Sequence, residues 1–244
     1  MPHDVLRFGS RITALPIIHG SGDFALEVRR MMLEHRFDCV AVPLPPSFQA
    51  DVEEAIGLLP TPTLVLQRES SGYQSDWTPD PIEDDDDSDG GCSFVPIDPC
   101  QGVIMALRVA MGEHITRRFV DLETSPFVPY SEPLPDPYAL KKVSLERFAA
   151  AVLPTIARPT LEQRKDRITH MASRLRELES QHESILFVCS ILDWPWIREA
   201  YVEQRECETS DAFVPSTESY EVENDTLAFM LGELPFITGL YEKA

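Results

Sequence analysis

Short apolar runs alternate along the chain with segments in which apolar residues recur every three or four positions. The runs are typical of buried strands, and the recurring pattern is typical of helices with one buried face. The expected strands are residues 12–18, 39–42, 63–66, 93–97, 118–122 and 185–189. Apolar stripes predict helices at residues 24–32, 48–59, 103–111, 138–153, 160–180, 194–201 and 236–244. Strands separated by helices predict an α/β fold with a mostly parallel central sheet and helices on both faces.

Two segments depart from this alternation. Residues 68–91 are rich in Gly, Ser, Pro and Asp, and residues 83–89 alone carry six carboxylates. We predict that this segment is a long, flexible acidic surface loop inserted into a single α/β domain that covers residues 1–244. The helix expected at residues 236–244 stops without a cap or a breaker. We therefore expect that these residues are the N-terminal part of a longer chain, and that a C-terminal domain or a protein partner covers this helix.

Charge and composition narrow the possible partners. A net charge of -20 argues against nucleic acid and anionic membrane surfaces, since both require a positive patch. No apolar run approaches the length of a membrane span, and the first residues carry no secretion signal pattern. The five cysteines are scattered and odd in number, which favours a reducing, cytoplasmic compartment.

Candidate chemistry lies where the expected strands end. In an open parallel sheet, ligands bind outside the carboxyl ends of the strands, so a small molecule or peptide is the expected partner. His19, Asp98 and Asp193 lie at or just after the ends of expected strands, and Asp121 lies near the end of another, which Glu123 follows. Such a mixture could bind a divalent metal or carry out general acid/base chemistry. N-capping of the following helices explains Asp98 and Asp193 equally well. Because no ligand pair has a metal-binding spacing, we expect no tightly bound metal and no cofactor.

Two further features suggest anion binding, each with a structural alternative. The turn at residues 19–22 includes Gly20 and Ser21, and it could hold an anion at the start of a helix. The alternative is an ordinary structural turn. Arg167 and Arg174 lie on the same flank of one expected helix and could hold an anion together. The alternative is a solvated flank that pairs with surface carboxylates.

Several motifs stand in a defined order along residues 11–240. They are HGSG at residues 19–22, DCVAVPLPP at 38–46, FVDL at 119–122, RITHMASRL at 167–175 and ILFVCSILDWPWI at 185–197. This order resembles the TraB/ChaN/erythromycin-esterase-like superfamily, and most closely its large uncharacterised bacterial branch. The resemblance implies a hydrolase-like α/β domain, because members of the superfamily include esterases, metallopeptidase-like proteins and a haem-binding lipoprotein.

The chain departs from that family pattern at positions that carry chemistry. Pro43 stands where the family usually has a glutamate, Ile168 where it often has an acidic residue, and Asp193 where it usually has a histidine. The resemblance leaves His19 as the general base or a ligand, with Asp121 and Asp193 as supporting carboxylates. Two hypotheses follow: a hydrolase-like domain with a depleted active site, or a non-catalytic binding or assembly domain.

Overall fold

Strands and helices alternate through most of the chain, and the computed structural model describes residues 5–68, 91–130 and 132–243. The strands are β1 (Ile12–Ile17), β2 (Cys39–Val42), β3 (Thr63–Arg68), β4 (Cys92–Ile97), β5 (Thr116–Phe119), β6 (Ile185–Ser190) and β7 (Thr217–Glu221). The α-helices are α1 (Gly22–Glu34), α2 (Gln49–Ile56), α3 (Gly102–Gly112), α4 (Leu145–Val152), α5 (Glu162–Gln181), α6 (Trp194–Val202), α7 (Leu227–Met230) and α8 (Pro235–Lys243). Short 3-10 turns are η2 (Pro46–Phe48), η3 (Pro137–Lys141) and η4 (Leu153–Thr155). The α/β class predicted from the alternation is confirmed.

Four strands form a parallel sheet in the order β1-β6-β2-β5. Strand β6 is central and pairs with β1 on one side and β2 on the other. All four residues of β2 are buried, as are the first five of β6. Consecutive side chains of a strand point to opposite faces, so both faces of this sheet are covered. The finer expectation, that helices cover both faces, stays a prediction.

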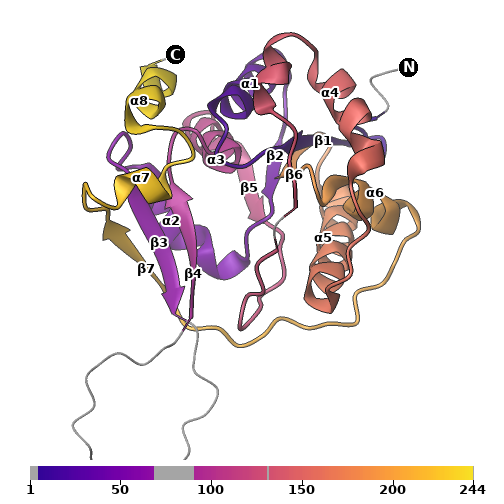
Figure 1. Cartoon of the computed structure of the whole chain (residues 1–244). Coiled ribbons are helices and arrows are strands. Elements are labelled where there is room, and N and C mark those ends of the chain that lie inside the picture. The colour runs from indigo at the N-terminus through magenta and orange to yellow at the C-terminus, as the bar shows by residue number, and fades with distance from the viewer. Residues whose placement is uncertain (1–4, 69–90, 131, 244) are drawn as a thin grey trace, which may run out of the picture.

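The expectation that residues 63–66 and 93–97 join the parallel sheet is wrong. Strand β3 pairs antiparallel with β4 and with β7, which makes a separate three-stranded sheet in the order β4-β3-β7. Figure 1 shows these three strands side by side, apart from the parallel strands. A parallel pair needs a crossover, usually a helix, whereas the segment between β3 and β4 has no apolar periodicity. That segment, the predicted acidic loop, lies outside the described residues except at its ends, and Arg68 belongs to β3.

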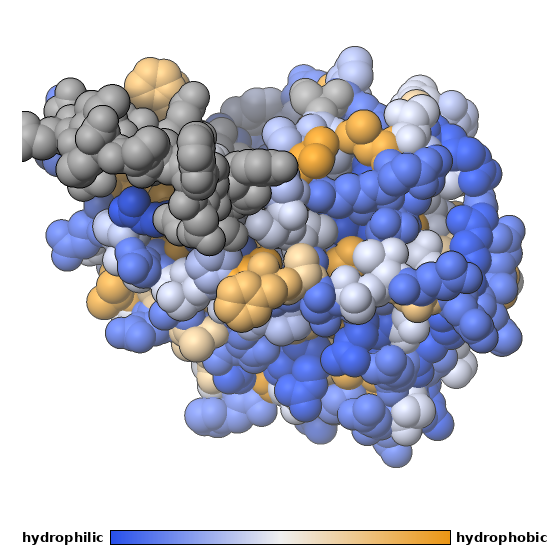
Figure 2. All heavy atoms as spheres, turned by 90° about the horizontal axis from the view of Figure 1, so that it is seen from below, coloured by the Kyte–Doolittle hydropathy of each residue, from blue (hydrophilic) through white to orange (hydrophobic). Residues whose placement is uncertain are grey.

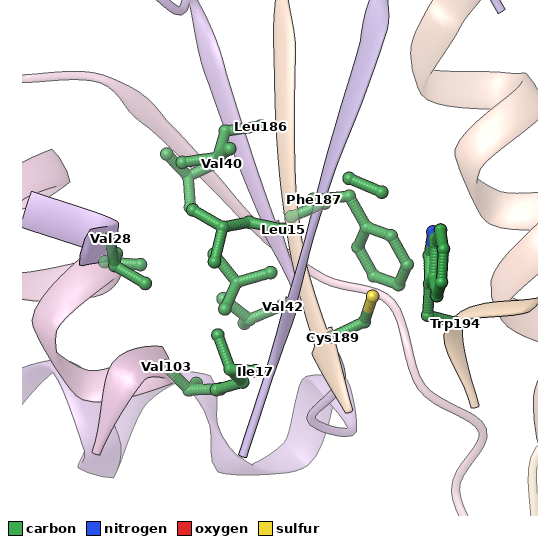
Figure 3. Packing of buried hydrophobic residues seen from close by; sticks show 14 of the residues in the cluster. Leu15, Ile17, Val28, Val40, Val42, Val103, Leu186, Phe187, Cys189 and Trp194 are labelled. Carbon is green, nitrogen blue, oxygen red and sulfur yellow. The ribbon is translucent and has the colours of Figure 1, made fainter. Parts of the chain in front are cut away.

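The core lies on both sides of the parallel strands. Figure 3 shows Leu186 and Phe187, neighbours in β6, pointing to opposite sides of the sheet. Val28 of α1 and Val103 of α3 lie on the side of Leu186, and Trp194 lies on the side of Phe187. All five residues belong to one cluster of buried apolar residues.

Two expected elements differ from the structure. The helix predicted at residues 138–153 is divided into η3 and α4. The backbone is extended at Ser144, the N-cap of α4, so the helix cannot continue through this residue. The strand predicted at residues 118–122 begins and ends earlier in the structure. It is β5 (Thr116–Phe119), so Asp121 lies just beyond the strand. Among the described residues, none of the helices is long and apolar enough to cross a membrane.

Candidate functional site

The carboxyl ends of the parallel strands bring four of the singled-out residues to one edge. His19 follows β1, Pro43 follows β2, Asp121 follows β5 and Asp193 follows β6. Two adjoining cavities open there, of about 470 Å³ and about 330 Å³. The larger is bordered by Asp121 and Arg167, and the smaller by His19, Asp193 and again Arg167. The sheet topology therefore places these residues around a common space, as the strand-end pattern predicts.

Arg167 occupies the boundary between the two cavities. Its Nε donates hydrogen bonds of 3.1 Å to both carboxylate oxygens of Asp121, and its Nη2 donates to Oδ2 of the same carboxylate. Burial lowers the pKa of Arg167, but the charge and hydrogen bonds of Asp121, together with Tyr130 and Asp193, outweigh burial and raise the pKa above its ordinary value. Phe127 covers the guanidinium, with 4.9 Å between Cζ and the ring centre. This arrangement fixes Arg167 in place and occupies Asp121.

A second buried arginine neutralises Asp193. Arg164 donates from Nε to Oδ1 of Asp193 at 2.8 Å, from Nη2 to the carbonyl oxygen of Leu192 at 3.1 Å, and from Nη1 to Glu132. Its Cζ lies 3.9 Å from the ring centre of Tyr130, whose hydroxyl donates to Asp193. Burial raises the pKa of Tyr130, and Asp193 raises it further. The side chain of Asp193 makes no capping bond to α6, so N-capping does not account for it.

His19 is the polar group of this edge that faces the cavity most openly. It is exposed, borders the smaller cavity, and lies in the turn between β1 and α1. Protein atoms around the ring replace part of its hydration, which lowers the pKa of His19. Asp193 acts in the opposite direction, and Arg167 adds to the lowering. His19 is therefore a neutral imidazole near pH 7, able to accept or donate a hydrogen bond.

Arg174 does not take part in this site, so the predicted anion pair with Arg167 is wrong. Its Nη1 lies 2.5 Å from a carboxylate oxygen of Glu177, three residues along α5 on the exposed surface. Arg167 instead turns toward Asp121 at the sheet edge. The alternative of a solvated arginine that pairs with a surface carboxylate is correct for Arg174.

Asp98 and Glu123 border neither cavity, and each hydrogen-bonds to nearby backbone groups. Asp98 follows β4 in the antiparallel sheet and accepts hydrogen bonds from the backbone N–H groups of Cys100 at 2.8 Å and Gly232 at 3.0 Å. Burial raises its pKa, and these two backbone donors reduce the effect. Glu123 accepts from the backbone N–H of Ser47 at 2.7 Å and from its hydroxyl at 2.9 Å. Both carboxylates thus hold loops together rather than facing the cavities.

The turn after His19 contacts the C-terminal segment. Gly20 has a φ of 76°, which favours glycine, and its N–H donates to Oε1 of Gln101 at 3.0 Å. Gly232 packs so closely against Gly20 that a Cβ built on Gly232 would lie 2.2 Å from Cα of Gly20. Ser21 is buried, and its hydroxyl has no hydrogen-bond partner among the described residues. The turn is filled by protein at this point, which favours its structural interpretation over an anion site.

Three residues of the edge were not anticipated from the sequence: Arg164, Tyr130 and Glu132. Arg164 stands three positions before Arg167 on α5, so the two side chains share one face of the helix. Tyr130 and Glu132 lie in the proline-rich segment after β5 and border the smaller cavity. The spacing of the two arginines was a usable signal, whereas nothing in the sequence shows that the segment folds back over the edge.

Figure 2 shows the molecule from below the view of Figure 1. Small apolar patches there are set in a largely hydrophilic surface. In the described part of the chain, no group of three or more His, Cys, Asp or Glu side chains is arranged to hold a metal ion.

Comparison of the chain with protein-family models, with curated proteins and with solved structures gives no match. The resemblance to the TraB/ChaN/erythromycin-esterase-like superfamily therefore stays a prediction.

Proposed function

We propose that this chain binds a small molecule at the carboxyl edge of its parallel sheet, as a hydrolase-like α/β domain with a depleted active site. The observation that supports binding over catalysis is the pairing of the carboxylates. Asp121 is occupied by Arg167, and Asp193 by Arg164 and Tyr130. A carboxylate whose oxygens are already held by an arginine is less free to contact a substrate or a water molecule.

The departures from the family pattern support the same conclusion. Pro43 borders both cavities at the end of β2, where the resembled family would place a glutamate. A proline side chain offers neither a proton acceptor nor a metal ligand. It adds instead to the apolar wall of the site, which suits a ligand with an apolar body.

The proposal includes a cytoplasmic location in a bacterium. The free state of Cys39, Cys92, Cys100, Cys189 and Cys207 supports a reducing compartment. The bacterial origin rests on the family resemblance alone.

Hydrolysis is the second candidate function, and His19 is the observation that favours it. The ring is exposed to the cavity, and its lowered pKa keeps it neutral, which is the state that a general base requires. A water held between His19 and a bound ester or amide could then attack the carbonyl carbon. Hydrolysis by this route requires no carboxylate beside His19, although it would be slower without one.

Binding is tested by ligand-observed NMR with a library of uncharged fragments. Leu134 is 45% exposed and borders the smaller cavity, so Leu134→Trp should narrow the site without disturbing the core. Leu33 is 64% exposed on α1 and borders neither cavity, so Leu33→Trp is the matched control. We expect hits whose signals are lost with Leu134→Trp and kept with Leu33→Trp. Equal loss, equal retention, or an absence of hits would contradict the proposal.

Hydrolysis is tested by turnover of a panel of model esters and amides by the wild-type chain. His19→Ala should abolish any turnover while the melting temperature changes little, and His35→Ala on the exposed end of α1 is the control. Turnover that depends selectively on His19 would make hydrolysis the function of the site. Turnover that survives His19→Ala would remove His19 from this role.

A further inference from the structure

The two cavities at the sheet edge adjoin each other. They share the lining residues Pro43, Phe127, Pro129 and Arg167, which lie where the two cavities meet. Cavities of about 470 Å³ and 330 Å³ each fall within the range that small ligands occupy, which is roughly 300–1,000 Å³. A ligand longer than either cavity would pass Arg167 to occupy both.

The two halves differ in chemistry. The larger half, which we call the apolar arm, lies between the loop after β2 and the antiparallel sheet. Its wall includes Leu44, Phe48, Phe94, Val95, Leu122 and Phe127. The smaller half, which we call the polar arm, has a largely apolar wall that includes Ile18 and Leu192. It differs from the apolar arm in the polar side chains set into that wall, which are His19, Tyr130, Glu132, Ser190 and Asp193. A ligand that fits both arms carries an apolar chain at one end and hydrogen-bonding groups at the other.

The charges around the site argue against an anionic ligand. Arg164 and Arg167 are matched by Asp121, Asp193 and Glu132, so the carboxylates outnumber the arginines. The chain as a whole carries -20, which repels anions further. A carboxylate or phosphate would have to displace Asp121 or share its arginine.

Arg167 nevertheless retains a donor at the junction of the arms. Its Nε and Nη2 bind Asp121, whereas Nη1 makes no hydrogen bond to any of the described residues. Arg167 borders both cavities, and a guanidinium N–H without a protein acceptor is suited to a neutral acceptor such as a carbonyl oxygen. The neutral ring of His19, which borders the polar arm, adds a second donor or acceptor.

We infer that the ligand is an uncharged, elongated acyl compound, an amide or ester whose carbonyl binds Arg167 and whose apolar chain lies in the apolar arm. This inference rests on the proposed binding function and names its ligand class. It predicts two separable properties: affinity rises with chain length, and it falls when the head group becomes a carboxylate.

The test is calorimetric titration with phenylalkanamides of increasing chain length, each beside the carboxylate of the same acid. Each methylene group buried in the apolar arm should tighten binding about fourfold, from roughly 0.8 kcal/mol per group. Each amide should bind about tenfold more tightly than its carboxylate, and Arg167→Lys, which keeps the charge and loses the Nη1 donor, should reduce that preference.

Two variants of the apolar arm test where the apolar chain of the ligand lies. Thr124→Trp should narrow the apolar arm and remove the gain with length, while the shortest amide still binds. Phe94→Ala removes a 56% exposed side chain from the wall of the same arm, and it should also reduce the gain in affinity with length. This variant replaces Thr124→Trp if the tryptophan variant does not fold. Leu33→Trp is again the control.

The possible failures are distinguishable. Affinity that does not change with the length of the ligand's chain would contradict the inferred ligand class, as would carboxylates that bind as tightly as the amides. Neither result would contradict the proposed binding function. Failure of both series to bind the wild-type chain would overturn the ligand class as well. The binding function itself would then fall only if the uncharged fragment library also gave no site-dependent hits.

Discussion

The parallel and the antiparallel sheet differ in how much of each strand is buried. In the parallel sheet, β2 is buried along its whole length and β6 over its first five residues. In the antiparallel sheet, β7 buries only Thr217, and β4 leaves Phe94 at 56% exposed. The parallel sheet contributes most of the strand residues of the core and carries the paired charges at its carboxyl edge, whereas the antiparallel sheet adds Val65, Val95 and Ile97 to the core. The antiparallel sheet lines one side of the cavity and presents much of its surface to solvent.

This difference shows that scaffold and cavity wall are separable parts of the molecule. Substitutions in the parallel sheet should change stability first, because its strands contribute directly to the core. Substitutions on the exposed face of the antiparallel sheet should change ligand binding with little effect on stability. The predictions below test that division, beginning with the largest expected effect.

Truncation of one phenylalanine in each sheet is the strongest test. Phe187 in β6 is fully buried, and Phe187→Ala should lower the free energy of unfolding by about 3–5 kcal/mol, from lost burial and the cavity left behind. Phe94→Ala in β4 should cost less than about 1 kcal/mol, because that ring is largely exposed already. Urea unfolding of both variants measures the two values. Similar costs would show that Phe94 contributes to the core as much as Phe187 does, and would contradict the division.

Removal of a buried arginine from the sheet edge comes next. Arg164→Met leaves Asp193 buried without its cation, which should cost about 3 kcal/mol. The double variant Arg164→Met with Asp193→Leu should recover part of this loss, because no uncompensated charge remains. Arg174→Met on the exposed side of α5 is the control and should change stability by less than about 0.5 kcal/mol. Equal effects of the two single variants would show that Arg164 is not a structural part of the edge.

The C-terminal segment after β7 attaches to the loop after β1, which gives a third test where the two regions meet. A Cβ on Gly232 would lie 2.2 Å from Cα of Gly20, so Gly232→Ala should destabilise the fold by about 1–3 kcal/mol through overpacking. Gly239 in α8 has open space around its Cα, so Gly239→Ala should be neutral or stabilise by up to about 1 kcal/mol. Thermal unfolding measures both. A neutral Gly232→Ala would mean that the segment is not seated against the turn.

The smallest expected effect is the pH dependence contributed by His19. The ordinary pKa of a histidine is 6.5, and that of His19 is lower in the folded chain. Between these two values the unfolded chain binds a proton that the folded chain does not. Stability is therefore fully present above pH 6.5 and decreases as the pH falls below it. His19→Gln should make this decrease shallower. A steeper or unchanged decrease, measured by urea unfolding across this range, would contradict the lowered pKa.

The sequence was most informative where apolar side chains form unbroken runs. The run ILFVC of β6 predicts a central buried strand, and the strand lies between β1 and β2. The stretch TESYE of β7 predicts nothing, because its side chains are polar and it pairs with β3 through backbone hydrogen bonds. Backbone pairing is available to any sequence, so the partner of a polar strand is set by the rest of the fold.

The candidate site was predictable in position and much less so in its pairing. Strand ends located His19, Asp121 and Asp193 at one edge, since parallel strands share a direction. The partners of Asp193 could not be anticipated, because Arg164 and Tyr130 reach it from segments distant in the chain. These partners decide the chemistry, as they turn apparent catalytic carboxylates into members of ion pairs.

The most direct test of binding at the carboxyl edge is a crystal structure of the chain soaked with the best-bound amide. We expect ligand density between Pro43 and Phe127, with the carbonyl oxygen within hydrogen-bond distance of Nη1 of Arg167 and the chain directed toward Phe48. Density for the amide at another surface, or an edge left empty at a saturating concentration, would contradict the proposed site.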